Sequence, residues 1–267
     1  MKLVDIHCHL EHDRFKQDLD KVIGRARKAK VISIITSGVN SSTNREVLEL
    51  QKKFPDIVKV SFGLYPLDVL AKEIEKGESN GFQRDVESFD VDAELKFIEK
   101  NKDKCIAIGE VGLDFSFNTG KEQEQIPIFE KILEFAHKLQ KPIIVHTRKA
   151  ELKCLELLEK HKSEKVVLHC FSGKKSLIKK GVELGYLFSV PPIITRLEHF
   201  QMLVKEAPIE QLLTETDAPY LSPVQGERNE PANVQVTIKE IAKIKNLSDK
   251  ETADAIYNNY KKLFQSK

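Results

Sequence analysis

The sequence has 267 residues, of which 40% are hydrophobic and 31% charged, with a formal net charge of +2. This composition excludes a disordered chain, and so small a charge does not by itself indicate a nucleic-acid-binding protein. No apolar run approaches the roughly 18 residues of a membrane span, and the first residues lack a signal-peptide pattern. Four cysteines without paired spacing indicate a reducing cytoplasm.

Short β-branched runs alternate with longer amphipathic stretches along the chain. The pattern predicts strands at residues 2–6, 31–35, 57–62, 105–108, 143–145, 166–168, 186–190 and 211–213. It predicts helices at 18–29, after the capping cluster Ser41-Ser42-Thr43, and at 91–100, 121–140, 150–161, 175–184, 197–207, 234–243 and 248–264. Residues 67–90 are expected to be a loop with one short helix, long enough to cover a site.

Eight strands separated by helices in about 250 residues predict a single (β/α)8 TIM-type barrel over residues 1–267. A doubly wound open sheet is the alternative. That fold usually carries a glycine-rich phosphate-binding loop after an early strand, and the sequence has neither GxGxxG nor GxxxxGK.

Four imidazoles and two carboxylates follow the predicted strands. They are His7, His9, Glu110, His146, His169 and Asp217. The carboxyl ends of barrel strands meet at one face, so these groups are expected to converge there. Such donors suit divalent cations, and alternate residues of an extended strand place both imidazoles of His7-Cys8-His9 on one side.

Each of these residues also has an ordinary structural interpretation when taken alone. His146 or His169 would be a hydrogen-bonded core histidine, Glu110 a salt-bridge residue and Asp217 a turn residue. Their common position at one end of the strands favours a metal site. The other histidines, His12, His137, His161 and His199, are interpreted as surface or structural residues.

Several motifs resemble the TatD-type metal-dependent deoxyribonucleases, which are amidohydrolase-like barrels. The motifs are Asp5-Ile6-His7-Cys8-His9, Ile108-Gly109-Glu110-Val111-Gly112-Leu113-Asp114, His146-Thr147-Arg148, His169-Cys170-Phe171-Ser172-Gly173, Glu215-Thr216-Asp217-Ala218-Pro219-Tyr220-Leu221 and Arg228-Asn229-Glu230-Pro231. The resemblance covers about residues 2–264. It implies two divalent metal ions (Mg²⁺, Mn²⁺ or Zn²⁺) at the C-terminal face, one bound by His7, His9, Glu110 and Asp217, the other by Glu110, His146 and His169, with Glu110 bridging.

The sequence departs from the family pattern after the third strand. The family often has Gly-x-His-Pro-His there, whereas this chain has Gly63-Leu64-Tyr65-Pro66-Leu67. Tyr65 can hydrogen-bond a phosphate or water but is a poor base near neutral pH, so the role of the missing histidine is in doubt.

A two-metal site suits phosphodiester hydrolysis, with Asp217 binding a metal ion and taking the proton of the attacking water. Arg148, two residues after His146, is a candidate for a bidentate contact with a phosphate, and a structural ion pair is the alternative. Arg228, Lys174 and Lys175 are weaker candidates for phosphate contacts.

The favoured function is a monomeric cytoplasmic deoxyribonuclease that trims DNA ends, with single-stranded ends as the expected substrate. One alternative is a metal-dependent hydrolase of an ester or amide, such as a misacylated tRNA or a small cyclic amide. Another is a nucleic-acid-binding barrel without catalysis, against which the complete ligand set argues.

Overall fold

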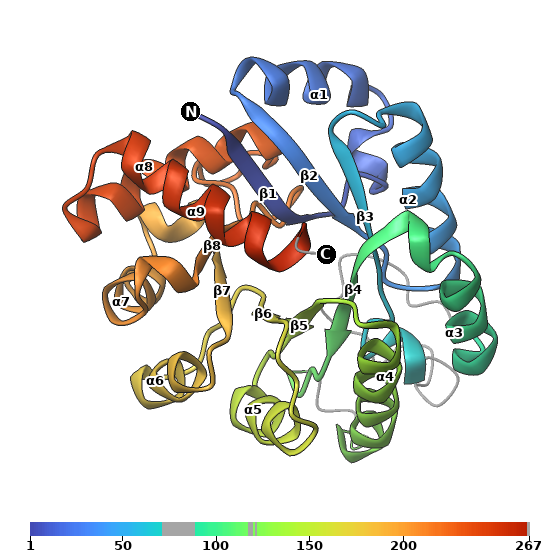
Figure 1. Ribbon diagram of the computed structural model, residues 1–267. Coiled ribbons are helices and arrows are strands. Elements are labelled where there is room, and N and C mark those ends of the chain that lie inside the picture. Colours follow the sequence, from blue (N-terminus) through green and yellow to red (C-terminus); the bar gives the residue numbers. More distant parts are fainter. Residues whose placement is uncertain (71–88, 117–119, 121, 266–267) are drawn as a thin grey trace.

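Eight parallel strands form the centre of the molecule (Figure 1). The computed structural model describes residues 1–70, 89–116, 120 and 122–265. The strands are β1 (Leu3–Cys8), β2 (Val31–Ser37), β3 (Val58–Phe62), β4 (Cys105–Gly112), β5 (Ile143–His146), β6 (Val166–Leu168), β7 (Leu187–Val190) and β8 (Leu212–Thr214). Each strand pairs with the next along the chain, which confirms the predicted (β/α)8 TIM-type barrel.

Hydrogen bonds join the first strand to the last and so nearly close the barrel. The Thr214 hydroxyl donates to the Val4 carbonyl (2.6 Å). Beyond the end of β8, the Asp217 N–H donates to the His7 carbonyl (2.9 Å), and the His9 N–H donates to the Ala218 carbonyl (2.7 Å). These bonds bring the segments after β1 and β8 together at the C-terminal end of the barrel.

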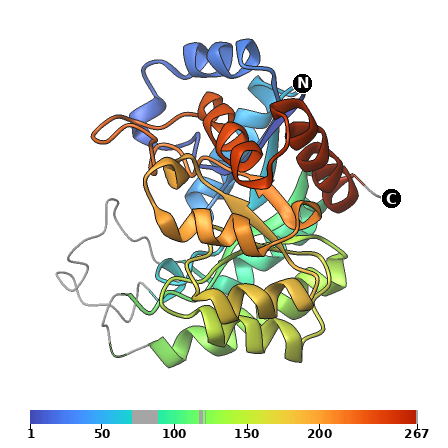
Figure 2. The same ribbon diagram turned by 90° about the vertical axis from the view of Figure 1, so that its left-hand side faces the viewer.

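Helices cover the outside of the barrel (Figures 1 and 2). They are α1 (Leu19–Lys28), α2 (Ser41–Lys53), α3 (Val91–Lys100), α4 (Gln125–Leu139), α5 (Glu151–Lys160), α6 (Lys175–Glu183), α7 (Glu198–Glu206), α8 (Val234–Lys245) and α9 (Asp249–Phe264). Within the described part of the chain, every helix falls short of the length and apolar character that a membrane span needs.

The last helix, α9, is anchored at the opposite end of the barrel from the converging strand ends. Its Tyr260 hydroxyl lies 2.8 Å from the Ser33 hydroxyl of β2, and both side chains are buried. The Asn259 amide donates to the carbonyl of Leu212, the first residue of β8 (2.9 Å). These contacts join α9 to the N-terminal part of the barrel strands, away from the predicted site.

The observed elements differ from the predicted ones mainly at their ends. The cap of α2 is Asn40, whose side chain accepts from the Thr43 N–H (3.0 Å), rather than the predicted serine cluster. The fourth strand continues to Gly112, so Glu110 lies within it and not after it. In the predicted 67–90 loop, a 3₁₀ turn spans Asp68–Leu70, while residues 71–88 lie outside the described part.

Gly112 holds β4 against β5 in a conformation that other residues rarely adopt. Its φ is +143°, and a Cβ atom at this position would lie 2.0 Å from the His146 carbonyl oxygen. The next N–H, of Leu113, donates to that same carbonyl (3.1 Å). A side chain here would therefore push apart the two strands that carry Glu110 and His146.

We predict that Gly112→Ala destabilises the protein much more than Gly185→Ala. Both glycines have positive φ, but a Cβ at Gly185 would meet nothing within 4 Å. Gly185→Ala is expected to lower the free energy of unfolding by about 1–2 kcal/mol, the cost of a left-handed non-glycine residue. Gly112→Ala adds a backbone clash and is expected to cost at least ~2 kcal/mol more. Urea denaturation of the two variants measures the difference, and equal losses would contradict it.

Candidate metal centre

The six predicted donor side chains lie together at the C-terminal end of the barrel, which confirms their convergence. They come from β1 and the residues just after it, from β4, from the end of β5, and from the segments after β6 and β8. Five of them are buried and Asp217 is partly exposed. Burying so many titratable groups together is costly unless they neutralise one another or hold a metal ion.

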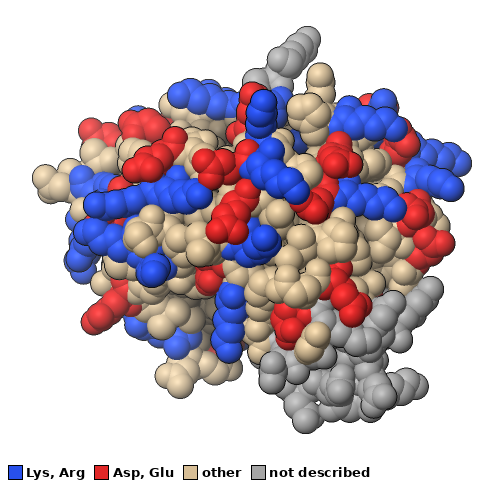
Figure 3. Space-filling model, turned by 90° about the horizontal axis from the view of Figure 1, so that it is seen from below, with Lys and Arg blue, Asp and Glu red and all other residues tan. Residues whose placement is uncertain are grey.

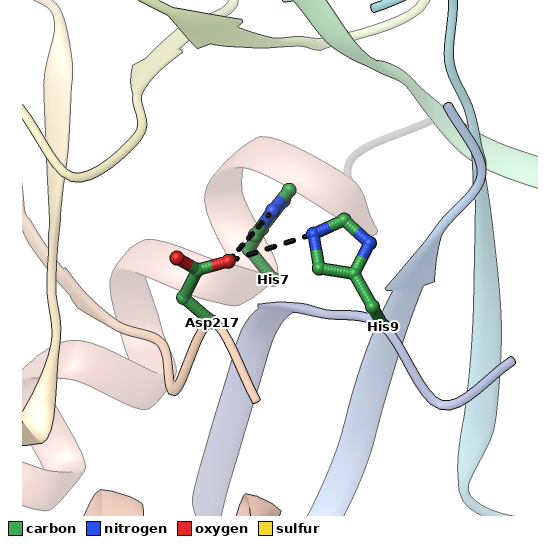
Figure 4. A group of neighbouring side chains, drawn as sticks. All are labelled: His7, His9 and Asp217. Atoms are coloured by element: carbon green, nitrogen blue, oxygen red, sulfur yellow. Dashed lines mark ion pairs between the residues drawn. The ribbon is translucent and has the colours of Figure 1, made fainter. Parts of the chain in front are cut away.

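Donor atoms of His7, His9 and Asp217 lie within 4.8 Å of one another next to β1 (Figure 4), and Glu110 lies beside the two imidazoles. The His7 Nε2 atom lies 3.5 Å from Glu110 Oε2 and 3.6 Å from Asp217 Oδ1. The His9 Nε2 atom lies 3.6 Å and 3.5 Å from the same two oxygens. Donors about 2.1 Å from a tetrahedral metal ion are about 3.4 Å apart. The spacings therefore suit a divalent cation shared by His7, His9 and Asp217, with Glu110 next to both imidazoles.

The His7 ring supplies a second sign that these donors suit a cation. Its Nδ1 lies 3.1 Å from the Ser37 hydroxyl, while its buried Nε2 has no hydrogen-bond partner among the described residues. Burial and the neighbouring His169 lower the pKa of His7, which favours the neutral imidazole. A neutral ring bonded at Nδ1 presents its Nε2 lone pair to a metal ion.

The Glu110 carboxylate is divided between two groups of imidazoles. While Oε2 faces His7 and His9, Oε1 lies 2.8 Å from His146 Nδ1 and 3.8 Å from His169 Nε2. Donor atoms of His7, Glu110 and His169 lie within 4.8 Å of one another, and His146 joins this group through its contact with Glu110. The arrangement can hold two cations, one on each side of the Glu110 carboxylate.

Buried carboxylates contact the ring nitrogens of His146 and His169 that point away from Glu110. Glu215 Oε2 lies 2.6 Å from His169 Nδ1, and Asp114 Oδ2 lies 2.9 Å from His146 Nε2. Burial lowers the pKa of His169, but the Glu215 charge outweighs it and raises that pKa to about 9. Such partners orient metal-binding histidines and make them more basic.

Asp5 fixes the turn that carries Asp217. Its carboxylate accepts from the Thr216 N–H (2.9 Å) and from the Thr216 hydroxyl (2.5 Å). The next residue, Asp217, has a φ of +52°, a left-handed conformation that its neighbours must enforce. Asp5 is fully buried, and burial raises the pKa of its carboxyl well above the usual value.

The three predicted substrate contacts have different surroundings. Arg148 is exposed and makes no ion pair with any described residue. Desolvation by the nearby protein lowers the pKa of its guanidinium, but Tyr65, Asp114 and Glu110 lie near enough to raise that pKa overall. The buried Tyr65 hydroxyl donates inward to Asp114 (2.8 Å). Arg228 makes a bidentate pair with Asp18 (2.7 Å for each bond), so a contact with substrate, which stays a prediction, requires that pair to open.

The weaker candidates and the remaining histidines have other surroundings than the donor groups. Lys175 pairs with Glu206 (2.6 Å), and Lys174 is the N-cap residue of α6. His12 and His161 flank helices, and His137 and His199 lie on α4 and α7, in line with the structural roles expected for them.

Sequence reasoning missed three supporting carboxylates, Asp5, Asp114 and Glu215. Each lies inside a quoted motif: Asp5 lies within β1, and Asp114 and Glu215 follow β4 and β8, but the sequence analysis gave none of them a role. Asp5 and Glu215 do carry a signal: each is a charged residue two positions before a ligand, on the same side of an extended chain. Asp114 has no comparable local signal, because its partners come from β3 and β5.

Comparisons with known proteins agree with this geometry. The family model described as TatD related DNase matches residues 4–265. Deoxyribonuclease TATDN3 of Homo sapiens is 37% identical over 266 residues, covering 98% of this chain and 94% of the relative. An uncharacterized metal-dependent hydrolase of Methanocaldococcus jannaschii is 39% identical over 267 residues, covering 99% and 98%.

A solved structure also resembles the chain along its whole length. The TatD homolog YjjV of Escherichia coli superposes with a TM-score of 0.85 at 26% identity, covering 99% of this chain and 98% of that one. Family model, relatives and structure agree, and the chain belongs to the TatD family of related DNases.

Proposed function

We propose that this chain hydrolyses phosphodiester bonds at DNA ends with the help of two divalent metal ions bridged by Glu110. The observation that carries the proposal is the division of the Glu110 carboxylate, with Oε2 toward His7 and His9 and Oε1 toward His146 and His169. The names of the relatives support DNA as the substrate. Single-stranded preference, a monomeric state and a cytoplasmic location stay predictions from the sequence.

The residues of the site divide the chemistry among themselves. Two divalent cations would supply an activated water and charge stabilisation for the attacking and leaving oxygens. Asp217 is the partly exposed carboxylate of the group and lies opposite the buried histidines, so it is placed to take the proton of the attacking water. Arg148 is placed to bind non-bridging phosphate oxygens with its planar guanidinium.

The surface offers little general attraction for DNA on the side of α4, α5 and α6. Figure 3 shows basic and acidic side chains interspersed on this side. Ion pairs link the helices there, including Lys160 with Glu130 (2.5 Å) and Lys180 with Glu159 (2.8 Å). Paired charges among the described residues leave little single-sign field on this face, so the proposal takes its phosphate contacts from groups near the metal centre.

The purified protein tests the proposal with DNA oligonucleotides labelled at the 5′ or the 3′ end, single- or double-stranded. We expect hydrolysis with Mg²⁺, Mn²⁺ or Zn²⁺ and none with EDTA. The Glu110→Gln variant, purified in the same way, controls for contaminating nucleases. Intact DNA under every metal condition would contradict the proposal.

We predict that Glu110→Gln weakens the binding of both metal ions and abolishes hydrolysis while the fold persists. A neutral amide offers one acceptor oxygen in place of a charged, two-sided bridge. The loss of affinity is expected to exceed the roughly 10–100-fold that follows removal of an outer partner of a metal ligand. Metal content after dialysis, circular dichroism and turnover measure the three effects. Normal metal content with near-normal turnover would rule out a bridging role.

We predict that Arg148→Lys lowers kcat/KM on a labelled oligonucleotide and that Arg148→Ala lowers it further. Loss of a charge-assisted contact costs ~1.5–3 kcal/mol, or about ten- to a hundredfold. Lysine keeps the charge but loses the two-pronged contact. The assays run at fixed salt, because phosphate contacts are salt-sensitive.

The matched control is Arg27→Ala. Arg27 is an exposed arginine that pairs with Asp56 (2.9 Å), just before β3 and so at the other end of the barrel. This variant is expected to match the parent on DNA. Equal kcat/KM values for the parent and both Arg148 variants would remove Arg148 from the site. Equal loss in the Arg27 control would show that the effect is not local.

A further inference from the structure

Tyr65, Asp114 and His146 form a buried hydrogen-bonded chain behind the second group of donors. The Tyr65 hydroxyl donates to Asp114 Oδ2 (2.8 Å), and His146 Nε2 lies 2.9 Å from that same oxygen. The Tyr65 and His146 rings meet edge to face, with centroids 5.0 Å apart. The three residues come from the segment after β3, the segment after β4 and the end of β5.

The other oxygen of Asp114 is also fully used. Asp114 Oδ1 accepts from the Ser116 N–H (2.8 Å) and from the Ser116 hydroxyl (2.5 Å). The main chain of Asp114 is clamped as well, because its N–H donates to the Gln125 side chain (2.7 Å), whose amide donates back to its carbonyl (2.8 Å). A fully buried carboxylate with both oxygens bonded and its backbone held at both groups has one position available.

These contacts determine which nitrogen of His146 carries the proton. An ionised carboxylate only accepts hydrogen bonds, and three of the contacts to Asp114 already come from N–H and O–H donors. His146 Nε2, at 2.9 Å, must therefore also donate. Nδ1 faces Glu110 Oε1 at 2.8 Å and can donate to it when no metal ion is bound. Because Nε2 is held as a donor by Asp114, Nδ1 is the nitrogen that would lose its proton and offer its lone pair to a metal ion.

We propose that Tyr65 and Asp114 are positioning residues that hold His146 with Nδ1 presented to the second metal ion. This inference rests on the proposed two-ion centre. Tyr65 stands where the family often has a histidine, and its hydroxyl is directed to Asp114 rather than to a substrate phosphate. Its function is therefore to hold a metal ligand, both through Asp114 and through the 3.4 Å contact of its own hydroxyl with His146 Nε2. This role differs from the substrate contact predicted from the sequence.

Disturbing Tyr65 or Asp114 should affect one metal ion only, because the donors next to β1 do not depend on the hydrogen bonds among Tyr65, Asp114 and His146. His7 is held by the Ser37 hydroxyl (3.1 Å), and His9 by the Ser37 carbonyl (3.1 Å). Loss of the Tyr65 hydroxyl or of the Asp114 charge should weaken one ion and leave the other as it is. A general loosening of the fold would instead weaken both.

The test is titration of the metal-free full chain with Mn²⁺ by calorimetry, comparing the parent with Tyr65→Phe and Asp114→Asn. We expect two Mn²⁺ ions on the parent. Asp114→Asn should weaken one ion by about 10–100-fold, because the new amide can donate to Nε2 and move the proton to Nδ1. Tyr65→Phe should weaken the same ion by less, about three- to tenfold, since Asp114 keeps its other contacts.

Tyr260→Phe is the matched control. It also removes a buried tyrosine hydroxyl that makes a 2.8 Å hydrogen bond, but at α9, far along the barrel from the centre. Its two affinities should equal those of the parent. Nitrogen-15 spectra of the histidine rings add a direct readout: His146 should be protonated at Nε2 in the parent and at Nδ1 in Asp114→Asn.

Three results would overturn the inference: unchanged affinities in both variants, equal weakening of both ions, or a parent that binds a single Mn²⁺. The nuclease proposal is judged separately. A chain that binds two Mn²⁺ ions with the expected pattern but leaves DNA intact would contradict the nuclease proposal and leave this inference standing.

Discussion

One buried carboxylate, Glu110, is the group on which the centre of this protein depends. An unpaired buried charge is unstable, and this one is compensated by imidazoles on two sides. Burial alone would raise the pKa of Glu110, yet contacts with His146 and His7 lower it well below the usual value. The barrel supplies these contacts because β1, β5 and β6 bring their imidazoles to the end of the barrel where β4 carries Glu110. Losing the end of β1, β5 or β6 would leave part of this charge without a partner.

The fold was predictable because every strand of a parallel barrel is covered on both sides. Such strands appear in the sequence as short, nearly continuous apolar runs, and β6 and α3 were predicted to the residue. The ends were less predictable where polar function enters an element. The run before Glu110 was expected to stop at Ile108, yet the strand continues to Gly112. Pairing with β5 decides the extent of β4, and that pairing is not visible in the local sequence.

The clustering of the six donor side chains was predictable from position, whereas the carboxylates behind them and the pairing of each arginine were not. A residue after a strand must point to the common face, so position alone was enough for the histidines. The two arginines show the limit. Arg148 and Arg228 both lie near strand ends in the sequence, but Arg228 meets Asp18 and stacks over the Phe15 ring (4.7 Å), while Arg148 remains exposed. The difference depends on partners about two hundred residues away in the sequence, which no local pattern identifies.

The supports also reveal an asymmetry between the two sides of the centre. On the side of β1, two carboxylates face the cation position directly, Glu110 and Asp217. On the other side, Glu110 is the one carboxylate among the described residues that faces the cation side of the His146 and His169 rings. Two further buried carboxylates contact the opposite nitrogens of these rings: Asp114 that of His146 and Glu215 that of His169. Negative charge is thus close to both cation positions, but on the second side it acts through the rings. Because imidazoles backed by carboxylates are more basic ligands, this arrangement would compensate for the absence of a second direct carboxylate on that side.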